Sequence, residues 1–304
     1  MIDGKSRSES RPKPEPPRIH LVAIGNELLN AETRDTNLAW LIRRLTRKGG
    51  RIVRAVMIPD DFDAIRREIE QAKEEGIDLL VTTGGLGPTD DDCTLAAIAK
   101  CVASPLKLDD GALELVRERI EVMSKFRPGI PTELTEERKT MAVFPEGGVP
   151  LRNPAGVAPG MMYKLDGMTL IVLPGVPSEM KGIFNETLKG FWRTFFKGVC
   201  YVRRNIVLKG IPEAELWPYV RRILEKDPGV YIKSRLKVVG RIEAVEEVRP
   251  PSELPWMIVL HFSVIECIRG NGTKRIDKLI DELVRDLEEN YEYPLHIDLN
   301  PGRV

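Results

Sequence analysis

The stretch of sequence from residue 79 to residue 94 reads Leu-Leu-Val-Thr-Thr-Gly-Gly-Leu-Gly-Pro-Thr-Asp-Asp-Asp-Cys-Thr. Positions 79–83 are apolar or β-branched, a composition typical of a buried strand. Four residues that free or fix the backbone follow: Gly84, Gly85, Gly87 and Pro88. Glycine lets a chain turn sharply and approach a ligand closely. Thr89 or Asp90 can then cap a helix. The stretch therefore predicts a strand, a glycine-rich loop and a helix N-terminus in succession.

Such a succession forms an anion site, because the backbone N–H groups at a helix N-terminus point toward the ligand. Three carboxylates, those of Asp90, Asp91 and Asp92, lie at the same place. One of them can cap the helix and complement its dipole, but the others would repel a bare phosphate. A divalent cation removes the conflict, because carboxylate and phosphate oxygens can share Mg²⁺. The loop predicts a metal-assisted phosphate or pyrophosphate site; the alternative is a structural turn with a solvated acidic cap.

Two common phosphate motifs do not fit the loop. A dinucleotide-binding fingerprint would need glycine at position 90, where the chain has Asp90, and it should follow the first strand of its unit. A Walker loop would need Gly-Lys-Ser or Gly-Lys-Thr, which the chain lacks.

The residues before the loop predict strands that alternate with helices. The strands are expected over 20–24, 51–58 and 78–83, and the helix after the second strand is capped by Asp60 or Asp61. Alternation of this kind predicts a parallel sheet with helices on both faces. Ligands bind at the carboxyl ends of the strands in such sheets. Both Gly25–Glu27 and Gly84–Asp92 lie at such ends, which supports a site there.

The residues after the loop predict a hairpin and then a second domain. Segments 161–165 and 168–173 suit two strands around Asp166-Gly167. Pro177 and Ser178 suit a helix start, with Glu179 in the first turn, either as a carboxylate of the site or as a complement to the helix dipole. Residues 198–304 predict a small α+β domain. Its Lys233 and Arg235 could face the first domain's site, or could simply be solvated on a strand edge.

Composition sets limits on the class of protein. The chain has 304 residues with 46 Lys+Arg and 46 Asp+Glu, so net charge gives no argument for nucleic acid or a membrane as partner. Its four cysteines form no Cys-x-x-Cys pair, which argues against a zinc site or a disulfide framework. Residues 1–17 are polar and proline-rich and predict a disordered tail without a signal peptide. We expect a cytoplasmic homo-oligomer, with a dimer as the commonest soluble form.

Five segments together resemble the N-terminal region of the CinA family, which has the MoaB/MogA-like molybdopterin-binding fold. They are Gly25–Leu29, Thr36-Asn37, Thr82–Thr94, Asn153–Gly160 and Leu173–Met180. The resemblance covers roughly residues 18–195, and it implies a three-layer αβα domain with a mostly parallel sheet over 18–197. The α+β domain over 198–304 resembles the small domain that follows in that family.

The resemblance also implies functions for individual residues. Phosphate or other ligand contacts are expected from Gly25, Glu27, Asn37, Thr83, Gly84, Gly85, Gly87, Pro88, Thr89, Asn153, Gly156, Pro174 and Gly175. Asp91 and Asp92 would hold a divalent metal such as Mg²⁺, and these two with Glu179 would be catalytic. Asn26 stands where many relatives carry aspartate, which weakens one possible metal ligand.

Three functions remain open on the sequence. The leading one is metal-dependent cleavage of a nucleotide diphosphate that resembles ADP-ribose or FAD. The second is a molybdopterin-binding or adenylylating protein of molybdenum cofactor biosynthesis, and the third is a non-catalytic nucleotide-binding protein. Full-length bacterial CinA proteins also carry a C-terminal amidohydrolase domain, and we do not expect its activity in a chain of this length.

Overall fold

The computed structural model of the protein describes residues 15–89, 92–126, 132–165, 167–238, 250–251, 254, 256–267 and 271–299. The chain forms two compact units, one over Pro16–Lys197 and the other from Gly198 onward. Each unit has its own sheet and its own apolar core.

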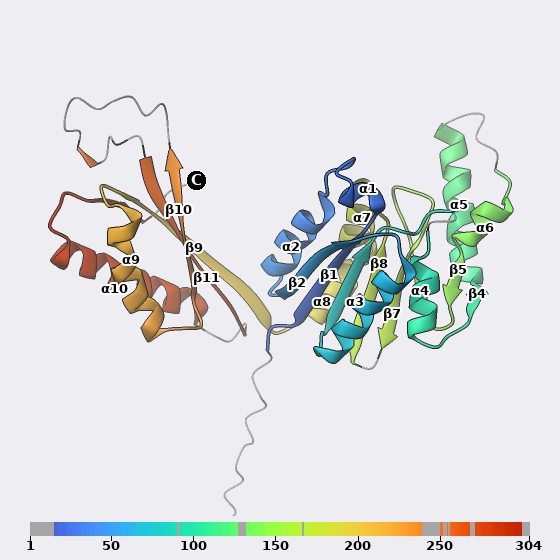
Figure 1. Ribbon diagram of the computed structural model, residues 1–304, viewed down its shortest axis with the longest axis horizontal. Coiled ribbons are helices and arrows are strands. Elements are labelled where there is room, and N and C mark those ends of the chain that lie inside the picture. The colour runs from blue at the N-terminus through green and yellow to red at the C-terminus, as the bar shows by residue number, and fades with distance from the viewer. Residues whose placement is uncertain are drawn as a thin grey trace, which may run out of the picture. The chain divides into compact units, whose positions relative to one another are not determined.

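The first unit is built on a six-stranded sheet with the order β2-β1-β3-β8-β7-β6 (Figure 1). Its strands are β1 (Arg18–Ile24), β2 (Arg51–Ile58), β3 (Leu79–Thr83), β6 (Val149–Leu151), β7 (Gly160–Leu165) and β8 (Met168–Leu173). The strands β2, β1, β3 and β8 are parallel to one another, whereas β7 and β6 are antiparallel to their neighbours. The predicted parallel sheet and the predicted hairpin of β7 and β8 are both confirmed.

Helices cover both faces of this sheet, as the three-layer prediction requires (Figure 1). They are α1 (Asn26–Leu29), α2 (Asn37–Arg47), α3 (Phe62–Glu74), α4 (Thr94–Cys101), α5 (Asp110–Phe126), α6 (Glu136–Thr140), α7 (Pro177–Gly182) and α8 (Lys189–Phe195). A π-helical turn, η1 (Ile183–Thr187), joins α7 to α8, and β4 (Leu106–Leu108) pairs with β5 (Val143–Pro145).

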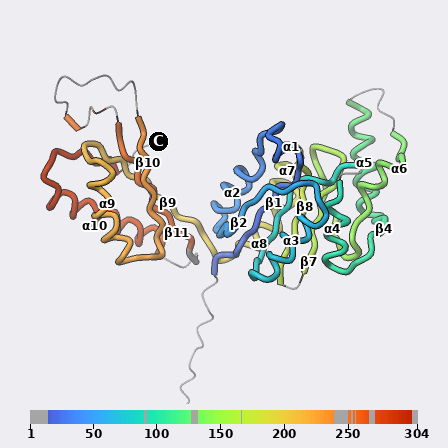
Figure 2. The backbone as a smooth tube through the Cα atoms, in the orientation of Figure 1, coloured from blue at the N-terminus to red at the C-terminus, as the bar shows by residue number. Residues whose placement is uncertain are grey.

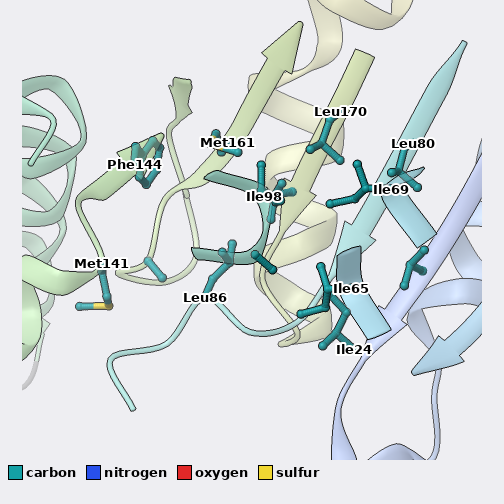
Figure 3. Close-up of a cluster of buried hydrophobic side chains, with 14 of the residues drawn as sticks. Ile24, Ile65, Ile69, Leu80, Leu86, Ile98, Met141, Phe144, Met161 and Leu170 are labelled. Atoms are coloured by element: carbon teal, nitrogen blue, oxygen red, sulfur yellow. The ribbon is translucent and has the colours of Figure 1, made fainter. Parts of the chain in front are cut away.

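One apolar cluster joins the helices α3, α4 and α5 to one face of the sheet. Figure 3 shows Ile69 of α3 beside Leu80 of β3 and Leu170 of β8, and Ile65 of α3 beside Ile24 of β1. These side chains are almost completely buried, and a buried aliphatic side chain stabilises a fold by about 1.5–3 kcal/mol. The cluster therefore holds the parallel strands in register, and their carboxyl ends form one edge.

The cap predicted at Thr89 is wrong. The helix after the glycine loop begins at Thr94, its N-cap residue Cys93 makes no side-chain capping hydrogen bond, and Asp90, the alternative cap, lies outside the described residues. The reason is that Asp92 turns its carboxylate back into the loop, so residues 84–93 form a longer connection than predicted. The helix α6 is short, with only Glu136–Thr140 helical. The helix start at Pro177 is confirmed, and Asp61 caps α3 by accepting a hydrogen bond from the Ala64 amide.

The second unit alternates β9 (Val199–Lys209), α9 (Glu213–Lys226), β10 (Tyr231–Val238), β11 (Trp256–Cys267), α10 (Gly272–Asn290) and β12 (His296–Asp298). The sheet has the order β10-β11-β9-β12, and its neighbouring strands are antiparallel. Both helices pack on one face of it, as the backbone trace in Figure 2 shows. The small α+β domain is therefore confirmed. Within the described ranges, every helix is too short or too polar to cross a lipid bilayer.

Candidate functional site

A cleft of about 550 Å³ lies at the carboxyl ends of β1, β3 and β8. Its lining is Ile24, Glu27, Asp60, Gly84, Gly85, Leu86, Gly87, Pro88, Asp92, Met123, Met141, Ala155, Gly156, Val157, Ala158, Pro174, Gly175, Val176 and Glu179. Ile24, Leu86, Met141 and Ala158 of this lining also belong to the buried apolar cluster, and Figure 3 labels the first three. The cleft therefore stands directly on the core, with loops at its rim.

Gly84 carries the glycine loop across the ends of the strands. Its amide donates a 3.0 Å hydrogen bond to the Leu173 carbonyl, which extends the ladder between β3 and β8 by one residue. Its φ is +115°, and a Cβ atom at this position would lie 2.1 Å from the Ile24 carbonyl oxygen. Only glycine fits a conformation of this kind so close to another backbone.

Asp92 fastens the loop on itself. Its carboxylate accepts hydrogen bonds from the Gly87 amide at 2.7 Å and the Thr89 amide at 3.0 Å, and a further one from the Thr89 hydroxyl. This arrangement holds the loop in shape and takes up two of its N–H groups. A carboxylate has about four acceptor sites, so Asp92 keeps capacity for one more partner.

Other amides around the cleft remain available to a ligand. Within the described part of the chain, the N–H groups of Gly85, Leu86, Gly175 and Val176 have no acceptor. They belong to the two loops that follow β3 and β8, and these strands are hydrogen-bonded neighbours. The two loops thus offer a set of backbone donors to an anion from adjacent strand ends.

Asn37 and Thr83 hold these two loops together from behind. The Asn37 amide group donates to the Thr83 hydroxyl at 3.0 Å and to the Gly175 carbonyl at 2.7 Å. The Thr83 hydroxyl donates to the Pro174 carbonyl at 2.8 Å. Asn37 and Thr83 are both buried. They therefore position the loops that line the cleft, rather than lining it themselves.

Asn153 positions Glu179 and the loop after β6 by hydrogen bonds. Its amide group donates to Glu179 Oε2 at 2.7 Å and to the Ala158 carbonyl at 2.8 Å, while its Oδ1 accepts from the Ala155 and Gly156 amides. A Cβ at Gly156 would lie 2.0 Å from the Glu179 carboxyl carbon. A side chain at position 156 would therefore displace this carboxylate from the cleft.

Burial raises the pKa of the Glu179 carboxyl above its ordinary value, and the hydrogen bond from Asn153 and the charge of Arg119 oppose the shift. Arg119 reaches the same loop, since its Nε donates to the Gly156 carbonyl at 3.0 Å. A raised carboxyl pKa inside a cleft is typical of groups that take part in proton transfer. Glu179 is a carboxyl of this kind, because it lines the cleft and its pKa is raised.

Four carboxylates line the cleft, those of Glu27, Asp60, Asp92 and Glu179. Asp60 also accepts a 2.7 Å hydrogen bond from the Asn26 amide, so it joins the start of α1 to the end of β2. Among the described residues, no three His, Cys, Asp or Glu side chains converge into a group that could hold a metal ion. The donor set fits Mg²⁺ of the kind that is held by one or two carboxylates and by phosphate oxygens of a ligand.

The structure brings most of the predicted site residues together. Ten of them line the cleft, namely Glu27, Gly84, Gly85, Gly87, Pro88, Asp92, Gly156, Pro174, Gly175 and Glu179. Thr89 lines a smaller neighbouring pocket of about 280 Å³. Gly25, Asn37, Thr83 and Asn153 lie behind the wall of the cleft, and the buried Gly25 donates its amide to the Ile58 carbonyl. Asp91 lies outside the described residues.

Sequence reasoning missed other residues of the cleft. Asp60 ends the loop after β2, so the rule that places ligands at carboxyl ends of strands could have found it. Met123 and Met141 lie on α5 and after α6, whose position over the cleft no local pattern indicates. Arg119 was missed for the same reason.

Comparison with known proteins places this fold in a family. A sequence model described as "Probable molybdopterin binding domain" matches residues 20–194. The chain belongs to this family. A protein of Aeropyrum pernix is 38% identical over 247 residues, which are 77% of this chain and 89% of that protein. A protein of Caldivirga maquilingensis is 39% identical over 235 residues, which are 76% of this chain and 86% of that protein.

A solved structure agrees with the family assignment. The protein CinA of Thermoplasma acidophilum, described as of unknown function, is 34% identical to this chain. The alignment covers 58% of this chain and 98% of that protein, with a TM-score of 0.51. The resemblance to CinA and to the MoaB/MogA-like molybdopterin-binding fold is thereby confirmed. The matched family region contains the glycine loop and Glu179, which form opposite parts of the same cleft.

Proposed function

We propose that the cleft binds a nucleotide diphosphate together with a divalent cation and hydrolyses its pyrophosphate bond. The observation that carries the proposal is the meeting of two kinds of group around one cleft. The unpaired amides after β3 and β8 suit phosphate oxygens, and four carboxylates stand beside them. Without a cation, the carboxylates would oppose the binding that the amides favour.

The binding step uses the backbone of the two loops. Phosphate oxygens accept hydrogen bonds from N–H groups near Gly85 and Gly175, which are held at adjacent strand ends by Asn37 and Thr83. The apolar side chains of Leu86, Met123 and Met141 suit the ring of a nucleobase on the same cleft. A divalent cation, when bound, neutralises the diphosphate and makes phosphorus more electrophilic.

The hydrolytic step needs a base, and Glu179 has the environment for it. Water attacks one phosphorus, and the bridging P–O bond breaks with its electron pair on the oxygen of the leaving phosphate. The products are two phosphate monoesters, which keep the two hydrogens of the water as monoanions and release both as protons when they become dianions. Ionised Glu179 accepts the proton of the attacking water, while Asn153 keeps its carboxylate directed into the cleft. A raised pKa brings such a base closer to neutral pH, where proton transfer is most effective.

A second candidate is binding or adenylylation of molybdopterin, which the description of the family favours. A pterin phosphate can use the same loop amides, and the flat pterin ring can use the same apolar side chains. Adenylylation would transfer AMP from ATP to that phosphate and release pyrophosphate. A non-catalytic nucleotide-binding protein would need the loops but not Glu179.

Ligand-induced thermal stabilisation combined with product analysis tests these candidates. The protein is heated with ADP-ribose, FAD or ATP, with and without Mg²⁺, because a ligand at 100 times its Kd adds about 2.7 kcal/mol to the stability of the folded state. Chromatography of the mixtures then shows whether the diphosphate is cleaved into two monophosphates. Stabilisation without cleavage of any of the three supports a binding protein, and no stabilisation by any of them contradicts the proposal.

Binding of the diphosphate should require a divalent cation, because four carboxylates surround the proposed phosphate site. We expect the affinity for ADP-ribose to fall at least tenfold in excess chelator, as each unscreened like-charge contact opposes binding. Isothermal titration with Mg²⁺ and with chelator measures this change. An undiminished affinity in chelator would contradict the role assigned to the cation.

Asp91→Asn and Asp92→Asn should have different effects, if Asp91 is a metal ligand and Asp92 fastens the loop. We expect Asp91→Asn to leave the melting temperature of the apo protein nearly unchanged and to weaken Mg²⁺-dependent binding at least tenfold, because asparagine lacks the charge. Asp92→Asn, in contrast, should lower the melting temperature of the apo protein. The side-chain amide of asparagine has one oxygen, so it cannot accept both backbone hydrogen bonds that the two oxygens of Asp92 accept. Wild-type metal response in Asp91→Asn would contradict its predicted role.

A further inference from the structure

The sheet of the second unit has one face that its own helices leave open. Its order of elements is β-α-β-β-α-β, and α9 and α10 both pack on the face that carries Ile206, Leu260 and Phe262 (Figure 1). Side chains alternate between the two faces of a strand. The other face therefore carries the odd-numbered residues of β9, β10 and β11, and we call it the open sheet face, although Val207 and Val259 near its middle are buried.

Three cations follow one another along the edge strand of the open sheet face. Lys233, Arg235 and Lys237 of β10 are exposed, and each is two residues from the next, so their side chains project in one direction. Within the described part of the chain, none of the three has an ion-pair partner within 4.0 Å. Arg203 of β9 adds a fourth exposed cation to this face.

Several cations on the helix side of the same unit are different, because carboxylates neutralise them. Arg222 pairs with Asp286 at 2.7 Å, and Lys226 pairs with Glu282 at 2.9 Å. On β9, Arg204 points to the helix side and lies 3.1 Å from Asp277. Among the described residues, the three cations of β10 thus lack a carboxylate partner, although the whole chain has equal numbers of acidic and basic residues. The open sheet face also carries the carboxylate of Asp298, which lies opposite Val207 at the β12 edge.

Aromatic rings stand among these cations. The strand register places Tyr231 opposite Ser263, which in turn is opposite Arg203, and places Lys233 opposite His261. Tyr231 is 64% exposed, so its ring is open to a stacking partner. Burial and the charges of Arg203 and Arg235 lower the pKa of His261. His261 is therefore a neutral ring at neutral pH and adds no further charge.

We propose that the open sheet face binds single-stranded nucleic acid, with Lys233, Arg235, Lys237 and Arg203 on the phosphates and Tyr231 stacked on a base. Unpaired cations beside exposed aromatic rings are the two features that single-strand-binding surfaces combine. A four-stranded sheet with both helices on its far face presents them on one surface, as RNA-binding sheets do. Net charge gave no argument for nucleic acid as a partner, because net charge does not show how charge is distributed over the surface.

The test measures the binding of the full-length protein to labelled RNA and DNA single strands about 12 nucleotides long, by fluorescence anisotropy at several salt concentrations. We expect the triple variant K233A/R235A/K237A to bind at least tenfold more weakly and the slope of log K against log salt to fall by about 2. Tyr231→Ala should weaken binding about fivefold or more, because a stacked ring is lost. RNA and DNA both support the proposal, and the tighter of the two identifies the ligand.

The triple variant R221A/K274A/K278A is the matched control, because it removes the same charge from exposed positions of α9 and α10. We expect it to bind as the wild type does. Equal losses in both triple variants would show a nonspecific charge effect and overturn the proposal. The proposal would also be overturned if Tyr231→Ala bound RNA as tightly as the wild type and inorganic polyphosphate displaced the RNA completely. Binding to anionic lipid vesicles without binding to either single strand would overturn it too. Unchanged melting temperatures of the variants exclude unfolding as the cause.

Discussion

Replacement of Glu179 with glutamine is expected to reduce the rate of diphosphate hydrolysis at least 100-fold without lowering the melting temperature of the apo protein. General-base groups contribute about 10²–10⁴-fold to rates, which sets the size of the expected loss. Glutamine retains the oxygen that accepts the 2.7 Å hydrogen bond from Asn153, so the loop should keep its shape. The rate is measured as release of AMP from ADP-ribose in excess Mg²⁺.

The stability of the wild type should respond to pH with a definite sign, and Glu179→Gln should lack this response. Because burial raises the pKa of Glu179 in the folded state, the folded protein binds this proton more readily than the unfolded chain does. The stability it contributes is present below the unfolded-state pKa and is lost as pH rises through the folded-state pKa. At neutral pH the ionised carboxylate costs stability, so Glu179→Gln should melt at the same temperature as the wild type or higher.

Glu186→Gln is the matched control, because Glu186 is exposed on the neighbouring η1 turn. It should leave both rate and stability unchanged. The wild-type rate should rise with pH through the raised pKa of Glu179, and this limb should be absent in Glu179→Gln. A wild-type rate in Glu179→Gln would remove Glu179 from the mechanism, and unstable folding of this variant would show that its role is structural.

The sequence was sufficient to predict the strands and the edge on which the cleft lies. Apolar runs ending in glycine, at Ile24 and at Thr83, mark strand ends without any knowledge of tertiary structure. Parallel connection then brings those ends to one edge. This is why Glu27 and Gly84 could be predicted together although they are far apart along the chain, whereas Gly175 was predicted only from the family resemblance.

Tertiary contacts decided what the sequence could not indicate. By residue type, Asp92 could be a helix cap or a metal ligand. In the structure its carboxylate turns into the loop and accepts hydrogen bonds from the amides of Gly87 and Thr89. Asn37 and Asn153 suit ligand contacts equally well by residue type, yet they bond to the loops that line the cleft. Short polar side chains can satisfy backbone groups in many ways, and only the folded chain selects one.

Net charge illustrates the same limit for the second unit. Equal numbers of acidic and basic residues gave no indication of a charged surface. Alternation along β10 separates Lys233, Arg235 and Lys237 from the carboxylates of α9 and α10. The separation depends on which face the helices cover, and this was not determined until the strands were paired.

Gly84→Ala is expected to lower the stability of the first unit by about 3 kcal/mol or more. A non-glycine residue in a sparsely populated backbone region costs about 1–3 kcal/mol, and here the φ is +115°. The new Cβ would also lie 2.1 Å from the Ile24 carbonyl oxygen, which cannot move without disturbing β1. For a unit of this size, such a loss lowers the melting temperature by roughly 6–12 °C.

Gly190→Ala supplies the comparison, because Gly190 lies within α8 and a Cβ there would meet nothing within 4 Å. Alanine in a helix is favoured over glycine by about 1 kcal/mol, so this variant should be at least as stable as the wild type. Calorimetry of both variants separates strain at the loop from a general effect of alanine. A melting temperature of Gly84→Ala within 2 °C of the wild type (under about 1 kcal/mol) would mean that the loop can shift away from β1. In that case the close approach of Gly84 to β1 does not hold the proposed phosphate-binding amides in place.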